Sequence, residues 1–358
     1  MTGQPGYPDF DSECHPQEVC FGCEGGDTTG RRVMGRDNPA DSAGLSETFL
    51  SGHRRYTSRQ VAAMAGVPMY RARRLWRALG FANVPDDAVE FTQADVEALK
   101  TLVGMVTAGA YDDDHLLLMT RSLGSYTARL AESQAELGAE ALATAGVPMA
   151  ERGAAWRGRA AWVLPDLEKL LIYSWRRHLA SAAGRLVDQE SNAVRLAVGF
   201  ADLVGFTRLS RQISEGELAR LVERFEGRSA DVIASSGGRL VKTLGDSVLF
   251  VTDTAHESAE IALRLLEVHG RTRGMPALRV GLAIGQVIGR MGDVFGAPVN
   301  LASRLTALAE AASVLADQAM AEALADDAAF ALRSGERVTV RGVGEVTPFV
   351  IRRRRRPA

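Results

Sequence analysis

The chain has 358 residues, of which 46% are apolar and 24% are charged, and its formal net charge is −2. This balance excludes a protein that is held to nucleic acid or to an anionic membrane by its overall charge. No apolar run approaches the roughly 18 residues that span a bilayer, and the first residues lack the basic and apolar segments of a secretory signal. We therefore expect a cytoplasmic protein without a membrane segment, long enough for two domains.

Residues 1–45 are predicted to form a disordered tail, because they are rich in Gly, Pro, Asp and Ser and have almost no apolar periodicity. All three cysteines lie in this segment. Cys20 and Cys23 have the spacing of a zinc or redox motif, with Cys14 and His15 upstream. The alternative, which we favour, is a passive tail with exposed thiols.

Residues 46–190 have a helical pattern, which predicts an all-α domain. Thr57 and Gln60 have capping-box spacing at the start of a short helix that ends at Gly66. A second helix follows Pro68, so the pair has a helix-turn-helix pattern. This second helix either reads DNA through its arginines or leaves them solvated or paired with acids, and we favour the latter. The arginines are Arg71, Arg73, Arg74 and Arg77.

Residues 166–187 are predicted to form one long helix, since apolar residues recur at i, i+3 and i+4 spacing and Pro165 lies just before the expected start. The helix leads into residues 191–358, where strand-like runs alternate with helical ones. A stiff element in this position either transmits a change of state between two domains or acts as a spacer.

The first chemically informative segment reads VGFADLVGFT from Val198. It predicts an apolar strand that carries Asp202 at its end, followed by a turn through Gly205, Phe206 and Thr207. Backbone amides in such a turn bind phosphate oxygens. A carboxylate beside a phosphate-binding turn indicates a cation between the two.

The second segment, GGRLVKTLGDSVLFV, predicts two strands joined by a tight turn with Asp246 at its tip and Lys242 four residues earlier. If this tip lies beside the strand end that carries Asp202, the two carboxylates can bind two divalent cations. Turn chemistry alone explains a Gly-Asp pair at a hairpin tip. The metal interpretation therefore depends on both aspartates together.

The third segment, GRMGDVFGAPVNLASRL, places Asp293 before a predicted helix that carries Asn300 and Arg304. Side chains four residues apart share one face of a helix, so these two would point into one site. A solvated helix face explains the same spacing about as well.

Together these segments resemble the signature of class III nucleotidyl cyclases over roughly residues 194–352, through the motifs FADLVGFT, KTLGD and VNLASR. The resemblance implies a catalytic domain with a ferredoxin-like βαββαβ core, and hence an α+β fold for the chain as a whole. It implies adenylate cyclase activity, which converts ATP to 3′,5′-cyclic AMP and pyrophosphate. The six matching residues are Asp202, Lys242, Asp246, Asp293, Asn300 and Arg304.

By this resemblance, Asp202 and Asp246 are metal ligands that hold two divalent cations per site, Mg²⁺ or Mn²⁺. Lys242 and Asp293 bind the adenine ring. Lysine donates to the ring nitrogen N1 and aspartate accepts from the N6 amine, whereas guanine presents the opposite pattern.

The remaining site residues contact the ribose and the phosphates. The resemblance implies that Asn300 orients the ribose and that Arg304 stabilises charge on the reacting phosphate, so both are catalytic. Phe206 and Thr207 are expected to bind substrate through the turn after the first strand. Arg290 is a further expected ligand of the triphosphate.

The family also implies the assembly. Two metal-binding aspartates come from one protomer and the other four residues from its partner, so we expect a homodimer with two composite active sites. The N-terminal sequence YTSRQVAAMAGVPMYRARRLWRALGF resembles the regulatory domain found ahead of soluble actinobacterial adenylate cyclases. The alternative function is a DNA-binding regulator whose cyclase-like domain serves dimerisation or nucleotide sensing. A diguanylate cyclase is excluded, because its Gly-Gly-Asp/Glu-Glu-Phe turn is replaced here by Leu-Gly-Asp-Ser.

Overall fold

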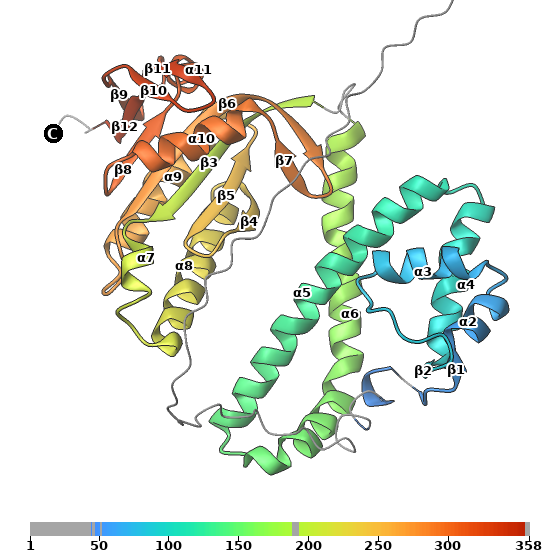
Figure 1. Ribbon diagram of the computed structural model, residues 1–358. Coiled ribbons are helices and arrows are strands. Elements are labelled where there is room, and N and C mark those ends of the chain that lie inside the picture. Colours follow the sequence, from blue (N-terminus) through green and yellow to red (C-terminus); the bar gives the residue numbers. More distant parts are fainter. Residues whose placement is uncertain (1–43, 45–46, 51, 188–192, 355–358) are drawn as a thin grey trace, which may run out of the picture. The chain divides into compact units, whose positions relative to one another are not determined.

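The structure of the chain is a computed structural model, and it describes residues 44, 47–50, 52–187 and 193–354 (Figure 1). The predicted tail, with its cysteine motif, therefore lies outside the described residues apart from residue 44. Two compact units divide the chain, residues 1–165 and residues 166–358. The domain boundary expected at residue 190 stays a prediction. No helix in the described part of the chain combines the length and the apolarity needed to cross a membrane.

The first unit is built from short and long helices around one apolar core. Val61, Leu75, Trp76 and Leu99 are buried in this core. The elements, the last of which runs into the second unit, are β1 (Tyr56–Thr57), α2 (Ser58–Met64), α3 (Met69–Ala78), β2 (Val89–Phe91), α4 (Gln93–Thr107), α5 (Asp113–Thr144), the 3₁₀ turn η1 (Met149–Glu151) and α6 (Arg152–Val187).

The expectation of an all-α first domain is corrected by a small two-stranded sheet. Strands β1 and β2 pair antiparallel, with Tyr56 opposite Phe91. The Phe91 ring lies 4.8 Å from that of Trp76, centroid to centroid. Aromatic side chains favour a pleated, half-buried surface, and these two short strands are held by packing on the helical core.

The predicted helix-turn-helix is present as α2 and α3, and its first helix begins at the predicted capping box. Thr57 and Gln60 exchange hydrogen bonds of 2.9 and 3.3 Å. Three of the four arginines of α3 bind acids of the same unit, and Arg77 donates to the carbonyl of Arg73. Arg73 pairs with Asp86 at 2.5 Å, and the remaining pairs are Arg71 with Asp113 at 2.5 Å and Arg74 with Asp114 at 3.6 Å. This is the alternative that we favoured over DNA reading.

The predicted long helix begins earlier than expected. Helix α6 runs from Arg152 to Val187, with Pro165 inside it and not before its start. A proline in a helix interior removes one backbone hydrogen bond, and the surrounding turns nevertheless continue the helix. The boundary between the two compact units falls at this proline.

The second unit is a mixed sheet with helices on both faces (Figure 1). Within the described residues this sheet has eight strands in the order β4–β5–β3–β6–β8–β12–β9, with β7 paired to β6, and β10 and β11 form a separate two-stranded sheet. The bounds of its elements are β3 (Ala193–Leu203), α7 (Phe206–Leu209), α8 (Glu215–Ser235), β4 (Arg239–Thr243), β5 (Ser247–Thr252), α9 (Ala255–Gly270), β6 (Leu278–Arg290), β7 (Asp293–Phe295), α10 (Ala297–Leu308), β8 (Ser313–Ala316), α11 (Gln318–Ala323), β9 (Phe330–Ser334), β10 (Val338–Val340), β11 (Gly344–Val346) and β12 (Phe349–Arg353).

Alternate residues of the central strands supply the two faces of the sheet. On β3, Ala201 and Leu203 pack under α8 and α9, whereas Val198 and Phe200 face the side that α10 covers. Helix α10 approaches β6 closely at Gly281, where a Cβ atom would lie 2.3 Å from the backbone of α10. Only glycine fits at such a distance, so Gly281 sets how α10 sits on the sheet.

A buried histidine lies between α8 and α9. His269 is fully buried, and its Nε2 atom lies 3.2 Å from the Ser229 hydroxyl. Its Nδ1 atom has no hydrogen-bond partner among the described residues. Burial, aided by the positive charge of Arg228, lowers the pKa of His269 from 6.5 to about 4. The imidazole is therefore neutral in the folded protein at pH 7.

We predict that His269 makes the fold sensitive to mild acid. Below pH 6.5 the unfolded chain protonates this residue while the folded chain does not, so the free energy of unfolding falls progressively as the pH is lowered toward 4. The loss amounts to roughly 3 kcal/mol. Urea unfolding from pH 7.5 to pH 4.5 measures it. The His269→Phe variant should show a flatter pH dependence, whereas the exposed His178→Phe control should keep the wild-type slope; equal slopes in all three proteins would contradict the prediction.

Candidate active site

Two aspartates meet at the end of β3. Asp202 lies opposite Ser247 on β5, the residue that follows Asp246. The backbone N–H of Leu203 donates a 2.9 Å hydrogen bond to the carbonyl of Asp246. Burial, together with the negative charge of Asp202, raises the pKa of Asp246. The structure thus brings the two predicted metal ligands into one site, where their charges repel each other.

Arg279 is the residue of this site that the sequence analysis missed. It lies opposite Asp202 on β6, and its Nη2 and Nε atoms donate to Asp202 Oδ2 at 2.6 and 2.8 Å. Its Nη1 atom also donates to the carbonyl of Ala307 in α10, at 3.2 Å. The available signal was a charged residue second in the otherwise apolar run LRVGLAIG. To use that signal, one needs to know that β3 and β6, which are far apart in the sequence, pair with Asp202 opposite Arg279.

The charges of this site fit a divalent cation. Two carboxylates face one guanidinium, and the Asp246 carboxylate, which accepts from its own backbone N–H, forms no ion pair among the described residues. No cluster of three or more His, Cys, Asp or Glu side chains suited to a metal occurs in the described part of the chain. A magnesium ion that is bound by one or two carboxylates takes its other oxygen ligands from water and substrate phosphates. The Asp202 and Asp246 pair meets that requirement.

Lys242 and Asp293 are joined by an ion pair. The Lys242 Nζ atom lies 2.5 Å from Asp293 Oδ2, and the backbone N–H of Val294 donates to Asp293 Oδ1 at 2.8 Å. Burial raises the pKa of Asp293, but these two hydrogen bonds and the charge of Lys242 outweigh it, so the pKa lies below its usual value. The contact forms because the β6–β7 hairpin, whose tip is Met291 and Gly292 at positive φ, carries Asp293 back to β4.

Asn300 and Arg304 lie one turn apart on α10, as predicted from their spacing. Both residues are exposed. Neither side chain has a hydrogen bond or ion pair within the part of the chain that the structure describes. These side chains, unlike Lys242 and Asp293, are thus available to a ligand without breaking an existing contact.

The other three predicted substrate ligands, Phe206, Thr207 and Arg290, lie in different surroundings. The side chain of Phe206 packs against the apolar core under α8 and α9. Thr207 is exposed, and the backbone N–H groups of both residues have no hydrogen-bond partner among the described residues. Arg290 is exposed at the end of β6 opposite to the end that carries Arg279. Within one protomer, Arg279 and not Arg290 is therefore the arginine at the carboxylate pair.

We predict that Arg279 balances the carboxylate pair in the absence of a cation. The Arg279→Gln variant leaves two partly buried carboxylates without a counter-charge, which should cost on the order of 2 kcal/mol of folding stability. A divalent cation should then restore more of that stability than it adds to the wild type. Thermal unfolding with and without Mn²⁺ measures both effects. Arg333→Gln, at an exposed position of β9, is the matched control; an equal response to Mn²⁺ in both variants would argue against the balance.

Comparison with known families agrees with the two-unit organisation. Residues 188–353 match the family described as adenylate and guanylate cyclase catalytic domain. Residues 40–178 match the family described as adenylate cyclase regulatory domain. The proposed site residues all lie within the first of these matches.

Individual relatives match over most of their length. The chain is 46% identical over 340 residues to a protein named adenylate cyclase from Streptomyces coelicolor, covering 87% of this chain and 89% of the relative. It is 48% identical over 284 residues to an adenylate cyclase from Streptomyces griseus, covering 78% of this chain and 71% of that one. An adenylate cyclase from Glutamicibacter nicotianae is 40% identical over 327 residues, covering 86% and 81%.

Proposed function

This chain belongs to the class III adenylate cyclases that carry a regulatory domain ahead of the catalytic domain, and from that premise we propose how it converts ATP to 3′,5′-cyclic AMP and pyrophosphate. The observation that carries the proposal is the meeting of Asp202, Asp246 and Arg279 at one sheet end. The cations of a bound triphosphate need carboxylate ligands, and its phosphates need a positively charged group. This site supplies both.

Asp202 and Asp246 would hold two divalent cations, Mg²⁺ or Mn²⁺. When bound, such cations lower the pKa of the ribose 3′-hydroxyl and neutralise charge on the triphosphate. We assign to Arg279 the phosphate-binding role expected of Arg290, because its guanidinium already lies at the carboxylates. The free amides of Phe206 and Thr207, in the turn after β3, would donate to phosphate oxygens.

Lys242 and Asp293 would select the base. Their ion pair joins one cationic donor to one anionic acceptor, and an adenine edge offers the matching acceptor N1 and donor N6. Adenine can replace the ion pair with two charge-assisted hydrogen bonds. Guanine presents a donor at N1 and an acceptor at O6, so the Lys242 donor would face a donor and the Asp293 acceptor would face an acceptor.

Asn300 and Arg304 would act on the reacting centre. The 3′-hydroxyl loses its proton to water as its oxygen attacks the α-phosphorus in line, the bond to the pyrophosphate oxygen breaks, and pyrophosphate leaves. Asn300 would orient the ribose for this attack. Arg304 would present a planar fork to the phosphate as charge develops on it, and the loss of such a group costs about 10² to 10³ in kcat.

Two observations support a homodimer with composite sites. Asn300 and Arg304 have no side-chain partner in their own protomer, as far as the described residues show. The β6–β7 hairpin, beside Asp293, exposes the large apolar side chains of Ile288 and Phe295, which are 53% and 52% exposed. An apolar hairpin next to half of a site suits burial against a second copy. We read β3–α8–β4–β5–α9–β6 as the ferredoxin-like core that carries this site.

We propose that the helical unit regulates this activity. The alternative, a DNA-binding regulator, has less support because three of the four arginines of α3 are bound by acids of the same unit. A DNA-reading helix keeps such side chains free to meet phosphates and base edges.

The proposed activity predicts the outcome of a direct assay. Purified full-length protein with Mn²⁺ should form cyclic AMP from ATP and far less cyclic GMP from GTP, measured by chromatography of the products. Asp246→Asn removes one of two metal-binding carboxylates and should lower kcat at least about 10²-fold. Asp253→Asn, an exposed aspartate at the other end of β5, should leave kcat unchanged. Cyclic AMP formation that survives Asp246→Asn, or its absence from the wild type, would refute the proposal.

A further inference from the structure

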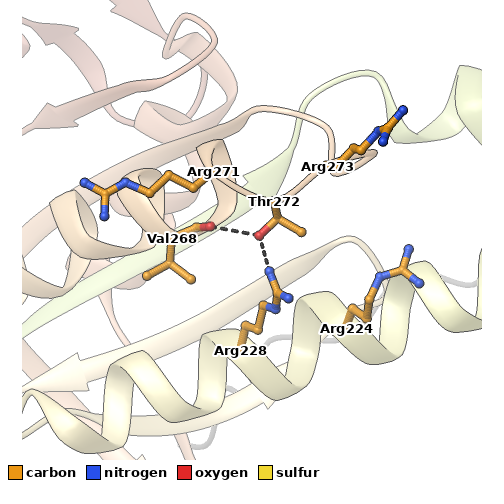
Figure 2. Close-up of a pocket in the computed structure, with 6 residues that line it drawn as sticks. All are labelled: Arg224, Arg228, Val268, Arg271, Thr272 and Arg273. Carbon is orange, nitrogen blue, oxygen red and sulfur yellow. Dashed lines mark hydrogen bonds between the residues drawn. The ribbon is translucent and has the colours of Figure 1, made fainter.

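A cationic depression lies on the second unit, away from the cyclase site. It has a volume of about 710 Å³ and lies between α8 and the end of α9 (Figure 2). Four arginines and no carboxylate line it; the lining residues are Arg224, Arg228, Val268, Arg271, Thr272 and Arg273. Helices α8 and α9 cover the sheet face opposite to α10, so this depression is distinct from the site built around Asp202.

The arginines of this depression lack the acidic partners that Arg279 and Arg353 of the same unit have. None of the four forms an ion pair within the described residues. The nearby acid Glu267, one turn before Arg271, is bound by Arg353, whose Nε atom lies 2.6 Å from Glu267 Oε1. Among the described residues, no carboxylate therefore lies within ion-pair distance of these four guanidinium groups.

Two of the four arginines share one face of α8, whereas Figure 2 shows the side chains of Arg271 and Arg273 extending to either side of the depression. Arg224 and Arg228 are one turn apart on α8 and share a face, where like charges repel. Figure 2 shows both side chains rising from α8 toward the loop that carries Thr272 and Arg273. Burial lowers the pKa of His269, and the positive charge of Arg228 lowers it further.

One guanidinium is already held in place. Arg228 Nη1 donates to the Thr272 hydroxyl, and that hydroxyl donates to the carbonyl of Val268 at 2.9 Å. This chain of hydrogen bonds fixes one end of the Arg228 fork and leaves its other N–H groups for a ligand. A helix C-terminus explains a basic residue such as Arg271 just after α9, but it does not explain Arg224 and Arg228 in the body of α8.

We propose that this depression, named here the α8–α9 arginine site, binds a ligand with clustered phosphate groups. Guanidinium forks match phosphate oxygens with paired, charge-assisted hydrogen bonds, and several forks together favour several phosphates over a single carboxylate. The ligand is either a free polyphosphorylated molecule or a phospholipid headgroup at a membrane surface. The site does not depend on the cyclase activity.

Two probes separate these sources. Isothermal titration of the full-length protein with inositol hexakisphosphate, in EDTA to remove divalent cations from the cyclase site, tests the free ligand. Cosedimentation with phosphatidylglycerol vesicles, against phosphatidylcholine vesicles, tests the headgroup. Binding of either probe should weaken at least about tenfold in Arg224→Gln/Arg273→Gln. It should persist in the matched double variant Arg333→Gln/Arg352→Gln and in Asp246→Asn.

The charge-retaining variant Arg224→Lys/Arg273→Lys should bind with intermediate affinity, because lysine keeps the charge and loses the fork. Thermal unfolding of each variant checks that it is folded. The proposal is overturned if neither probe binds to the wild type, if both glutamine double variants lose binding equally, or if Asp246→Asn abolishes binding. It is also overturned if a glutamate-rich peptide binds to the site and neither phosphate probe does.

Discussion

The register of β3 between β5 and β6 is the constraint on which the site depends. This register places Asp202 opposite Arg279 on one side and beside the Asp246 turn on the other. Because side chains alternate along a strand, a slip by one residue would turn Asp202 toward the core under α8 and α9. Ala201 and Leu203, which flank it, are buried in that core. The apolar packing that stabilises the sheet therefore also holds the carboxylate on the face where α10 lies.

Local sequence patterns were sufficient to predict the elements that carry the site. The strand before Asp202, the hairpin with Asp246 at its tip and the helix with Asn300 and Arg304 each follow from the spacing of apolar and turn residues. Contacts between distant segments did not follow from such patterns. The ion pair of Asp202 with Arg279 depends on strand register, and the closeness of Lys242 and Asp293 depends on how the β6–β7 hairpin folds back. The proline within α6 and the small sheet of the first unit were missed because packing outweighed local preference.

The two faces of the sheet differ in how their charges are balanced. On the face of α10, each cationic group that lies beside a carboxylate is paired with it, as Arg279 is with Asp202 and Lys242 is with Asp293. On the face of α8 and α9, Arg353 is held by Glu260 and Glu267, whereas the α8–α9 arginine site has no acid in its lining. A side chain in an ion pair can exchange that pair for contacts with a substrate when the substrate binds. Arginines without an ion pair suit a site that binds an anionic ligand.

The proposed sharing of one catalytic cleft between two protomers is tested most directly by mixing two inactive variants. Asp246→Asn removes a metal ligand, and Arg304→Ala removes the arginine that would come from the partner. After coexpression and random pairing, half of the dimers are mixed and each mixed dimer keeps one intact site, so about a quarter of the wild-type activity should return. If the mixture is no more active than the two variants measured separately, each protomer builds its own site and the account is wrong.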